Sequence, residues 1–135
     1  MSLNDILRDL VNDIDGALGC SVVDLTSGMV LAVHHNVPYF TQSFIDAAGA
    51  AGVDIFRGRN VTAVERMLAS QRGEAPDYHT YEMQMTSKNC YHFMTIIPDR
   101  PNSLLVLVTS TSTNLGMGWA SLRRSLPEIS PKCPS

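Results

Sequence analysis

The stretch FTQSFIDAAGAAGVDIF, residues 40–56, decides the fold because it predicts a helix with two adjacent apolar faces. Each of its two internal glycines costs about 1 kcal/mol relative to alanine in a helix, so the close approach of a second backbone should offset them. We therefore expect one face to pack on the chain's own sheet and the other on a second copy. The first face carries Phe40, Phe44, Ala47, Ala48, Ala51 and Ile55, and the second carries Ile45, Gly49, Gly52 and Phe56.

The composition is that of one globular domain. The 135 residues are 44% hydrophobic and 17% charged, and the net charge is −3. The basic residues are scattered and no run of about 18 apolar residues occurs, which argues against nucleic acid binding and against a membrane span. The N-terminus MSLNDILRDL does not show the charged-then-apolar pattern of a secretory leader, so we expect none. We expect a single cytoplasmic domain over residues 1–129 and a flexible C-terminal tail over 130–135.

The remaining segments predict an antiparallel sheet flanked by helices. Two β-rich runs joined by Leu-Thr-Ser-Gly are typical of a hairpin, and three later runs separated by turn signals predict a meander. This order indicates an α+β domain and not alternating βαβ units. The expected helices cover residues 3–14, 40–56, 61–72 and 115–126, and the expected strands cover 17–24, 29–35, 78–86, 90–97 and 103–109.

Two of these strands carry further information about their surroundings. Tyr81, Met83 and Met85 alternate with polar residues, so the third strand should have one dry face and one wet face. The run SLLVLVT, residues 103–109, is almost entirely apolar, which predicts a central strand covered on both faces.

Two motifs in register with this order resemble the roadblock family, the roadblock-type dynein light chains and their bacterial relatives. The first is GALGCSVVDLTSGMVLA, residues 16–32, and the second is TNLGMGWASLRRSL, residues 113–126. The first hairpin matches a Gly-x-x-small-x-x-apolar-apolar-Asp-x-x-Gly pattern, and the final helix begins with Asn-Leu-Gly. The matching residues are Gly16, Gly19, Val22, Val23, Asp24 and Gly28, then Asn114, Leu115 and Gly116.

The resemblance implies a roadblock/profilin-like three-layer α/β/α domain. Its five-stranded antiparallel sheet would carry the first and last helices on one face and the middle helix on the other. The resemblance also implies a homodimer formed through the middle helix and the third strand. The expected interface residues are Phe44, Ile45, Ala48, Gly49, Gly52, Phe56, Tyr81, Met83 and Met85.

The same resemblance implies a non-catalytic homodimeric adaptor or regulator. Its partner would be a small Ras-like GTPase, or a motor or signalling complex. One alternative is a small-molecule-sensing, profilin-like module with a pocket under the long helix. The second short helix, within residues 59–75, departs from the family pattern and bears on the geometry of the dimer.

The residues that suggest chemistry do not assemble into an expected catalytic, cofactor or metal site. His34 and His35 are adjacent in a strand and so point to opposite faces. Cys90 and His92 share a face but are too far apart along the strand for a nucleophile–base pair, and no orienting third group is evident. Three cysteines (Cys20, Cys90 and Cys133) without CxxC spacing fit free thiols. The arginines at 57, 59, 66 and 72 are read as a solvated face, with a GTPase-directed arginine as the alternative.

Overall fold

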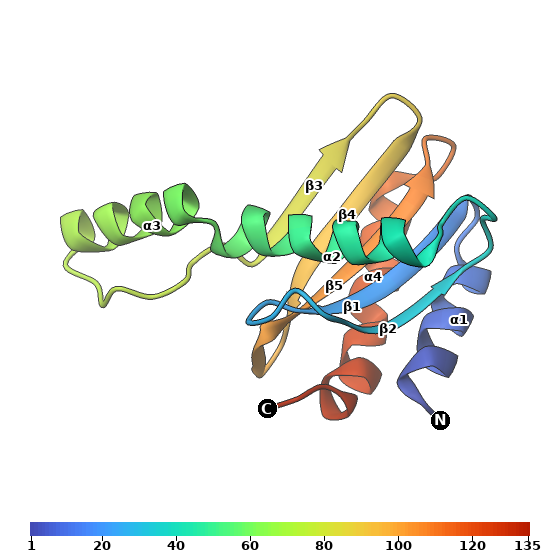
Figure 1. The fold of residues 1–135 in the computed structure, drawn as a ribbon, viewed down its shortest axis with the longest axis horizontal. Coiled ribbons are helices and arrows are strands. Elements are labelled where there is room, and N and C mark those ends of the chain that lie inside the picture. Colours follow the sequence, from blue (N-terminus) through green and yellow to red (C-terminus); the bar gives the residue numbers. More distant parts are fainter.

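The computed structural model describes all 135 residues, which form four α-helices and one antiparallel sheet of five strands in the order β2-β1-β5-β4-β3 (Figure 1). This confirms the predicted α+β class and the five-stranded antiparallel sheet. The elements are α1 (Leu3–Asp13), β1 (Ala17–Asp24), β2 (Val30–His35), α2 (Gln42–Arg57), α3 (Arg59–Arg72), β3 (Glu82–Thr86), β4 (Cys90–Ile97), β5 (Arg100–Ser110), α4 (Leu115–Ile129) and a short 3-10 helix, η1 (Ser130–Lys132).

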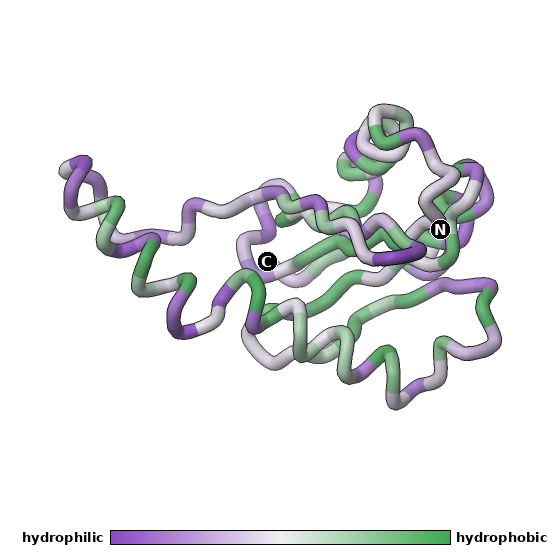
Figure 2. Tube along the Cα trace, turned by 90° about the horizontal axis from the view of Figure 1, so that it is seen from above, coloured by the Kyte–Doolittle hydropathy of each residue, from purple (hydrophilic) through white to green (hydrophobic).

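The sheet separates two hydrophobic clusters of unequal size. Helices α1 and α4 lie on one face and α2 lies on the other, as the view from above shows (Figure 2). The larger cluster contains 17 buried residues, among them Leu7, Phe93 and Leu122. The smaller cluster has five buried residues, with Phe56 from α2 packed against Leu104 and its neighbours. Most of the apolar stabilisation therefore comes from the α1/α4 face, and the α2 face is less completely filled.

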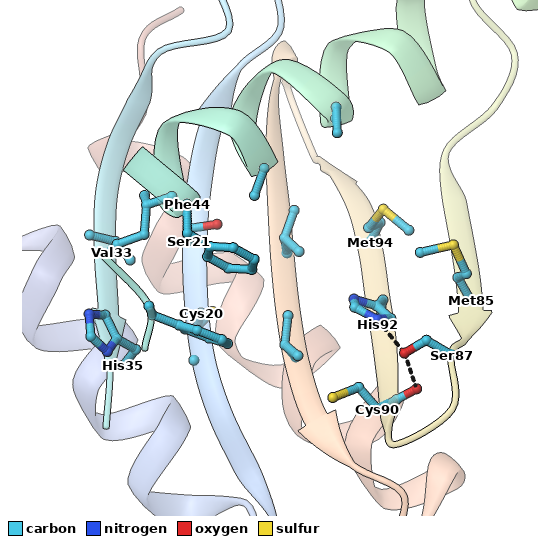
Figure 3. Close-up of a pocket in the computed structure, with 18 of the residues that line it drawn as sticks. Cys20, Ser21, Val33, His35, Phe44, Met85, Ser87, Cys90, His92 and Met94 are labelled. Carbon is cyan, nitrogen blue, oxygen red and sulfur yellow. Dashed lines mark hydrogen bonds between the residues drawn. The ribbon is translucent and has the colours of Figure 1, made fainter. Parts of the chain in front are cut away.

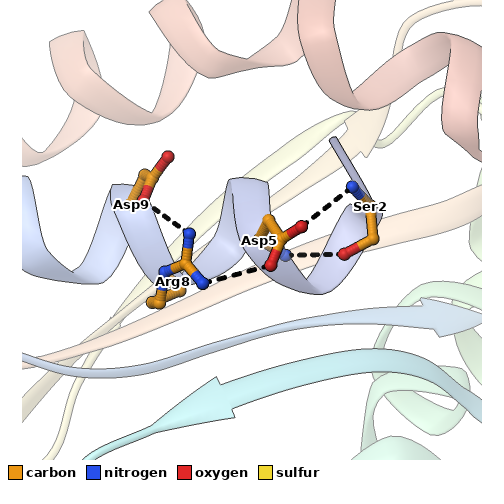
Figure 4. A network of polar contacts seen from close by, with 4 residues as sticks. All are labelled: Ser2, Asp5, Arg8 and Asp9. Carbon is orange, nitrogen blue, oxygen red and sulfur yellow. Dashed lines mark hydrogen bonds and ion pairs between the residues drawn. The ribbon is translucent and has the colours of Figure 1, made fainter.

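The N-terminal helix begins with a capping box. The Ser2 hydroxyl accepts a hydrogen bond from the Asp5 backbone N–H, and the Asp5 carboxylate accepts one from the Ser2 N–H (Figure 4). Arg8 pairs with Asp5 and Asp9 on the exposed side of the helix. These contacts fix the start of α1, and that start lies beside the edge strand β2.

Several element boundaries differ from the prediction. β3 begins at Glu82 and not at residue 78, while β5 begins at Arg100, inside a segment predicted as a loop. Helix α4 continues through Pro127 as far as Ile129, whose side chain is fully buried, so packing on the sheet outweighs the proline penalty of about 3 kcal/mol. Cys133 is also buried, and its carbonyl accepts a hydrogen bond from Arg100 Nε. The predicted flexible tail is therefore attached to the domain as far as Cys133.

Helix α3 starts at Arg59, two residues before the predicted start, and stands away from the three layers (Figure 1). Gly58 separates it from α2. Its buried residues are Glu65 and Ala69, and the Glu65 carboxylate accepts hydrogen bonds from the backbone N–H groups of His79 and Thr80. Glu65 thereby holds the segment that leads from α3 back to β3, residues 73–81, against the helix. Most of the surface of α3 stays exposed.

The two glycines of α2 face the chain's own sheet, and they predict contrasting effects of alanine. A Cβ at Gly49 would lie 2.7 Å from the Gly28 carbonyl oxygen, which is backbone and cannot move aside easily. A Cβ at Gly52 would meet only the end of the Leu104 side chain, at 3.3 Å.

We therefore expect Gly49→Ala to destabilise the domain by about 1–3 kcal/mol through overpacking. Gly52→Ala should stay within about 1 kcal/mol of wild type, because its helix propensity gain offsets a mild clash. Urea unfolding of both variants measures the difference. Equal effects of the two substitutions would contradict the close approach of α2 to the β1–β2 turn.

Candidate functional site

An apolar groove lies between α2 and the sheet, and it is the candidate functional site (Figure 3). Its cavity volume is about 400 Å³, and 14 of its 20 lining residues are hydrophobic. The C-terminal end of α2 closes one end, where Phe56 packs into the small cluster. At the other end the groove opens between the start of α2 and the turn that joins β3 to β4.

The wall formed by α2 ends in an exposed aromatic cluster. Phe40 and Phe44 stack with ring centroids 4.8 Å apart, and Tyr39 meets Phe40 edge-on at 5.3 Å. Tyr39 is 66% exposed and Phe44 is 49% exposed. Aromatic side chains with this much solvent-exposed surface are typical of interaction sites and not of a hydrophobic core.

The floor of the groove is the α2-facing side of the sheet, to which all five strands contribute. It includes Val106 and Val108 from β5, Met94 from β4 and Met85 from β3. The sequence predicts that residues 103–109 are covered on both faces. Within one copy of the chain, Val106 and Val108 are instead only half-buried. Helix α2 therefore leaves part of this apolar strand uncovered within the protomer.

Polar groups gather at the open end of the groove. The Ser87 hydroxyl donates to the Cys90 carbonyl at 3.3 Å and lies 3.1 Å from His92 Nε2. No third group orients the His92 ring, so the pair lacks the oriented base that a catalytic nucleophile needs. The arrangement stabilises the β3–β4 turn and does not activate a nucleophile.

The two edges of the sheet are covered differently. On β2, the Val33 backbone N–H donates to the Asn4 side-chain oxygen at 3.1 Å, so α1 protects that edge. On β3, every strand pairing is with β4, and the outer backbone groups have no partner. Met85 is 42% exposed beside this edge. Strand β3 is therefore an open edge available for pairing with another strand.

Four of the nine expected interface residues are placed elsewhere by the structure. Ile45, Gly49, Gly52 and Phe56 are buried against the chain's own sheet, so they offer no surface to a second copy. The physical reason is that Gly49 admits the β1–β2 turn of the same chain and Gly52 faces the Leu104 side chain of β5, so neither glycine faces a second helix. The other five residues lie on the groove or along the edge strand and stay a prediction: Phe44, Ala48, Tyr81, Met83 and Met85.

The remaining polar candidates do not converge on a chemical site. His35 faces the groove, and nowhere do three His, Cys, Asp or Glu side chains gather closely enough to hold a metal ion. Arg57 lies 3.7 Å above the Tyr78 ring and donates to the Pro101 carbonyl at 2.6 Å, so it ties the segment before β3 to the start of β5. No helix of the protein combines the length and apolar character that a membrane crossing needs.

His92 makes the stability of the domain depend on pH. Burial lowers the pKa of His92 below its usual value of 6.5. Below that pH the unfolded chain binds more protons than the folded chain, so the free energy of unfolding falls as the pH falls. His92→Gln keeps an N–H donor toward Ser87 and does not titrate.

We expect wild type to lose stability relative to His92→Gln between about pH 7 and pH 5. Urea unfolding across this range is the measurement. A stability difference that stays constant, or that changes in favour of wild type as the pH falls, would contradict the burial of His92.

Solved structures of roadblock domains share this fold over nearly the whole chain. Myxococcus xanthus MglB matches with a TM-score of 0.69 at 19% identity, covering 96% of this chain and 92% of that one. A roadblock/LC7 domain from Streptomyces avermitilis matches with a TM-score of 0.70 at 12% identity, covering 97% of each chain. An MglB with a tetrameric arrangement matches with a TM-score of 0.73 at 17% identity, covering 96% of this chain and 86% of that one.

No protein-family model matches the sequence, and a search of curated proteins finds no match either. The resemblance to roadblock domains is confirmed at the level of the fold: the chain has the roadblock/LC7 fold.

Proposed function

We propose that this protein is a non-catalytic homodimeric regulator that binds a small Ras-like GTPase. Three features support the proposal: the roadblock/LC7 fold, the two sequence motifs that resemble roadblock domains, and an unfilled apolar groove beside an open strand edge. The groove with its open edge is the observation that carries the argument for self-association.

A two-fold arrangement would cover both exposed features at once. Pairing β3 with the partner's β3 gives the unpaired backbone groups their hydrogen bonds and joins the two sheets. The same rotation sets the two α2 helices antiparallel above the joined sheet. Phe44, Ala48 and Met85 would then meet their counterparts across the interface. Because such an interface is isologous, each contact occurs twice.

The proposed activity is regulation by surface complementarity. The groove offers apolar and aromatic side chains, and its Ser87–His92 contact does not activate a nucleophile. A two-fold dimer presents two identical docking faces to its partner. By analogy with the roadblock family, the partner is a small Ras-like GTPase, whose nucleotide state or location the dimer would change.

The test takes the purified protein and the small Ras-like GTPases encoded by the same genome. Sedimentation velocity should give a dimer at micromolar concentration. Isothermal titration should then show that one of these GTPases binds the dimer more tightly in one nucleotide state, GDP or GTP analogue, than in the other. A protein that stays a single chain at high concentration would overturn the dimer. A dimer that binds none of these GTPases would overturn the proposed partner and leave a motor or signalling complex as the remaining candidate.

The groove also favours a second candidate function, the sensing of a small molecule. Its volume of about 400 Å³ lies within the usual range for ligand pockets. Polar groups at one end, Ser87 and His92, would orient an otherwise apolar ligand. A thermal-shift screen against cellular metabolites tests this candidate, because a ligand present at about 100 times its Kd adds about 2.7 kcal/mol of stability. A screen without a stabilising compound would count against it.

A further inference from the structure

We propose that α3 is an arm that reaches across the dimer and packs on the aromatic cluster of the second copy. The contact joins the exposed apolar stripe of α3 (Val64, Met67 and Leu68) to the partner's Tyr39, Phe40 and Phe44. It rests on the two-fold dimer of the proposed function and extends that dimer beyond α2 and β3.

The stripe on α3 has no cover within its own chain. Val64 is 54% exposed, Met67 is 63% exposed and Leu68 is 44% exposed. Their spacing of three and four residues places them on one side of the helix. The side buried by the chain itself is a different one, formed by Glu65 and Ala69.

A helix in this position needs a packing partner. It has 14 residues, and isolated helices of about 12–15 residues are marginal in water. Its main contact with another element is with the end of α2, and it projects from the body of the domain (Figures 1 and 2). The Glu65 carboxylate anchors one side, which leaves the apolar stripe as the surface available to another molecule.

The aromatic cluster at the other end of α2 is the matching surface. Tyr39 and Phe44 are exposed, and the stack of Phe40 on Phe44 forms one broad apolar patch. Thioether and aliphatic side chains pack well on aromatic rings, so a stripe that contains Met67 suits this patch.

The proposed two-fold rotation brings the two surfaces together. Helix α2 has 16 residues and is about 24 Å long. In an antiparallel pair centred near Ala48 and Ala51, the end of one α2 lies beside the start of the partner's α2. Helix α3 begins at Arg59, immediately after Gly58, so it continues past the partner's Phe44 toward the partner's Tyr39.

The charges on α3 agree with this orientation. Arg59 and Arg66 lie about 140° and 160° away from Val64 around the helix, so they face solvent when the stripe is covered. Neither residue forms an ion pair within the chain. The one acidic residue of the helix, Glu65, is turned to its own backbone.

The first test measures dimer dissociation by sedimentation equilibrium for Met67→Glu and Tyr39→Ala. Each variant should raise the dimer Kd at least tenfold, because each loss occurs twice in the dimer. The matched control is Ser70→Glu, which adds the same charge to α3 on its solvent side and should keep the wild-type Kd. A Met67→Glu variant with the Kd of Ser70→Glu would overturn the arm.

The second test detects the contact between the two chains directly, so it needs no variant that weakens the dimer. A Met67→Cys protein is mixed with a Tyr39→Cys protein and oxidised, so a disulfide between the two new thiols can form only between different chains. We expect a disulfide-linked heterodimer, and expect none when Ser70→Cys replaces Met67→Cys. If neither mixture cross-links while Phe44→Asp still dissociates the dimer, the arm is wrong and the proposed dimer stands. If the wild-type protein is a monomer, the arm and the dimer are both wrong.

Discussion

Phe44→Asp should convert the proposed dimer into monomers. Phe44 forms part of the groove wall, and a two-fold interface would bury it in both copies. A carboxylate at this position would have no partner among the apolar side chains around it. Hot-spot truncations cost about 2 kcal/mol or more each, so two copies give about 4 kcal/mol, close to a thousandfold rise in the dimer Kd. Sedimentation equilibrium over a wide range of protein concentration measures this change.

The control for this variant is Ser43→Asp. It places the same charge on the neighbouring residue, which is exposed and lies about 100° further around the helix. Ser43→Asp should leave the Kd unchanged. Circular dichroism should show that Phe44→Asp keeps its secondary structure, because Phe44 is already half exposed in the protomer. A folded Phe44→Asp protein with the wild-type Kd would remove α2 from the interface.

Phe56→Ala should destabilise the fold itself by about 3–5 kcal/mol. The Phe56 side chain is fully buried and packs with Met94 and Leu104 beneath α2. Its removal leaves a cavity that the neighbouring strands cannot close, because their backbones are fixed by the sheet. The measurement is urea unfolding in the monomeric Phe44→Asp background, which separates folding from association.

Ala51→Gly is the control for Phe56→Ala in the unfolding measurement. Residue 51 is exposed on the groove side of α2, so the change should cost about 1 kcal/mol through helix propensity alone. If Phe56→Ala cost no more than this in the monomer and weakened the dimer instead, Phe56 would belong to the interface, as the sequence first suggests.

The order of elements was predictable from local patterns. Alternation in Tyr81, Met83 and Met85 indicates a strand, and the turn signals around it separate the strands of the meander. The motifs at Gly16–Gly28 and Asn114–Gly116 indicate the roadblock-like fold. Each of these signals depends on residues close together in the chain, which is why they can be read without coordinates.

The candidate site was only partly predictable. The sequence identifies α2 and the third strand as carriers of exposed apolar residues, and Phe44, Ala48 and Met85 do line the groove. It does not indicate the contact between Ser87 and His92, because that contact depends on the path of the β3–β4 turn. It also gives no sign that α3 stands apart, since its apolar spacing is the same as that of a helix packed on a core.

The sequence by itself determined that most of residues 40–56 form a helix with two apolar faces, which the structure places at Gln42–Arg57, since a side chain's angular position follows from helix periodicity. Only the tertiary structure decided which face turns inward. Gly49 can meet the Gly28 carbonyl because neither residue has a side chain in the way, and this contact joins residues far apart in the chain. That packing turns the glycine face to the chain's own sheet and leaves Phe44 and the alanines free. Such a choice depends on contacts between distant segments, which local periodicity does not contain.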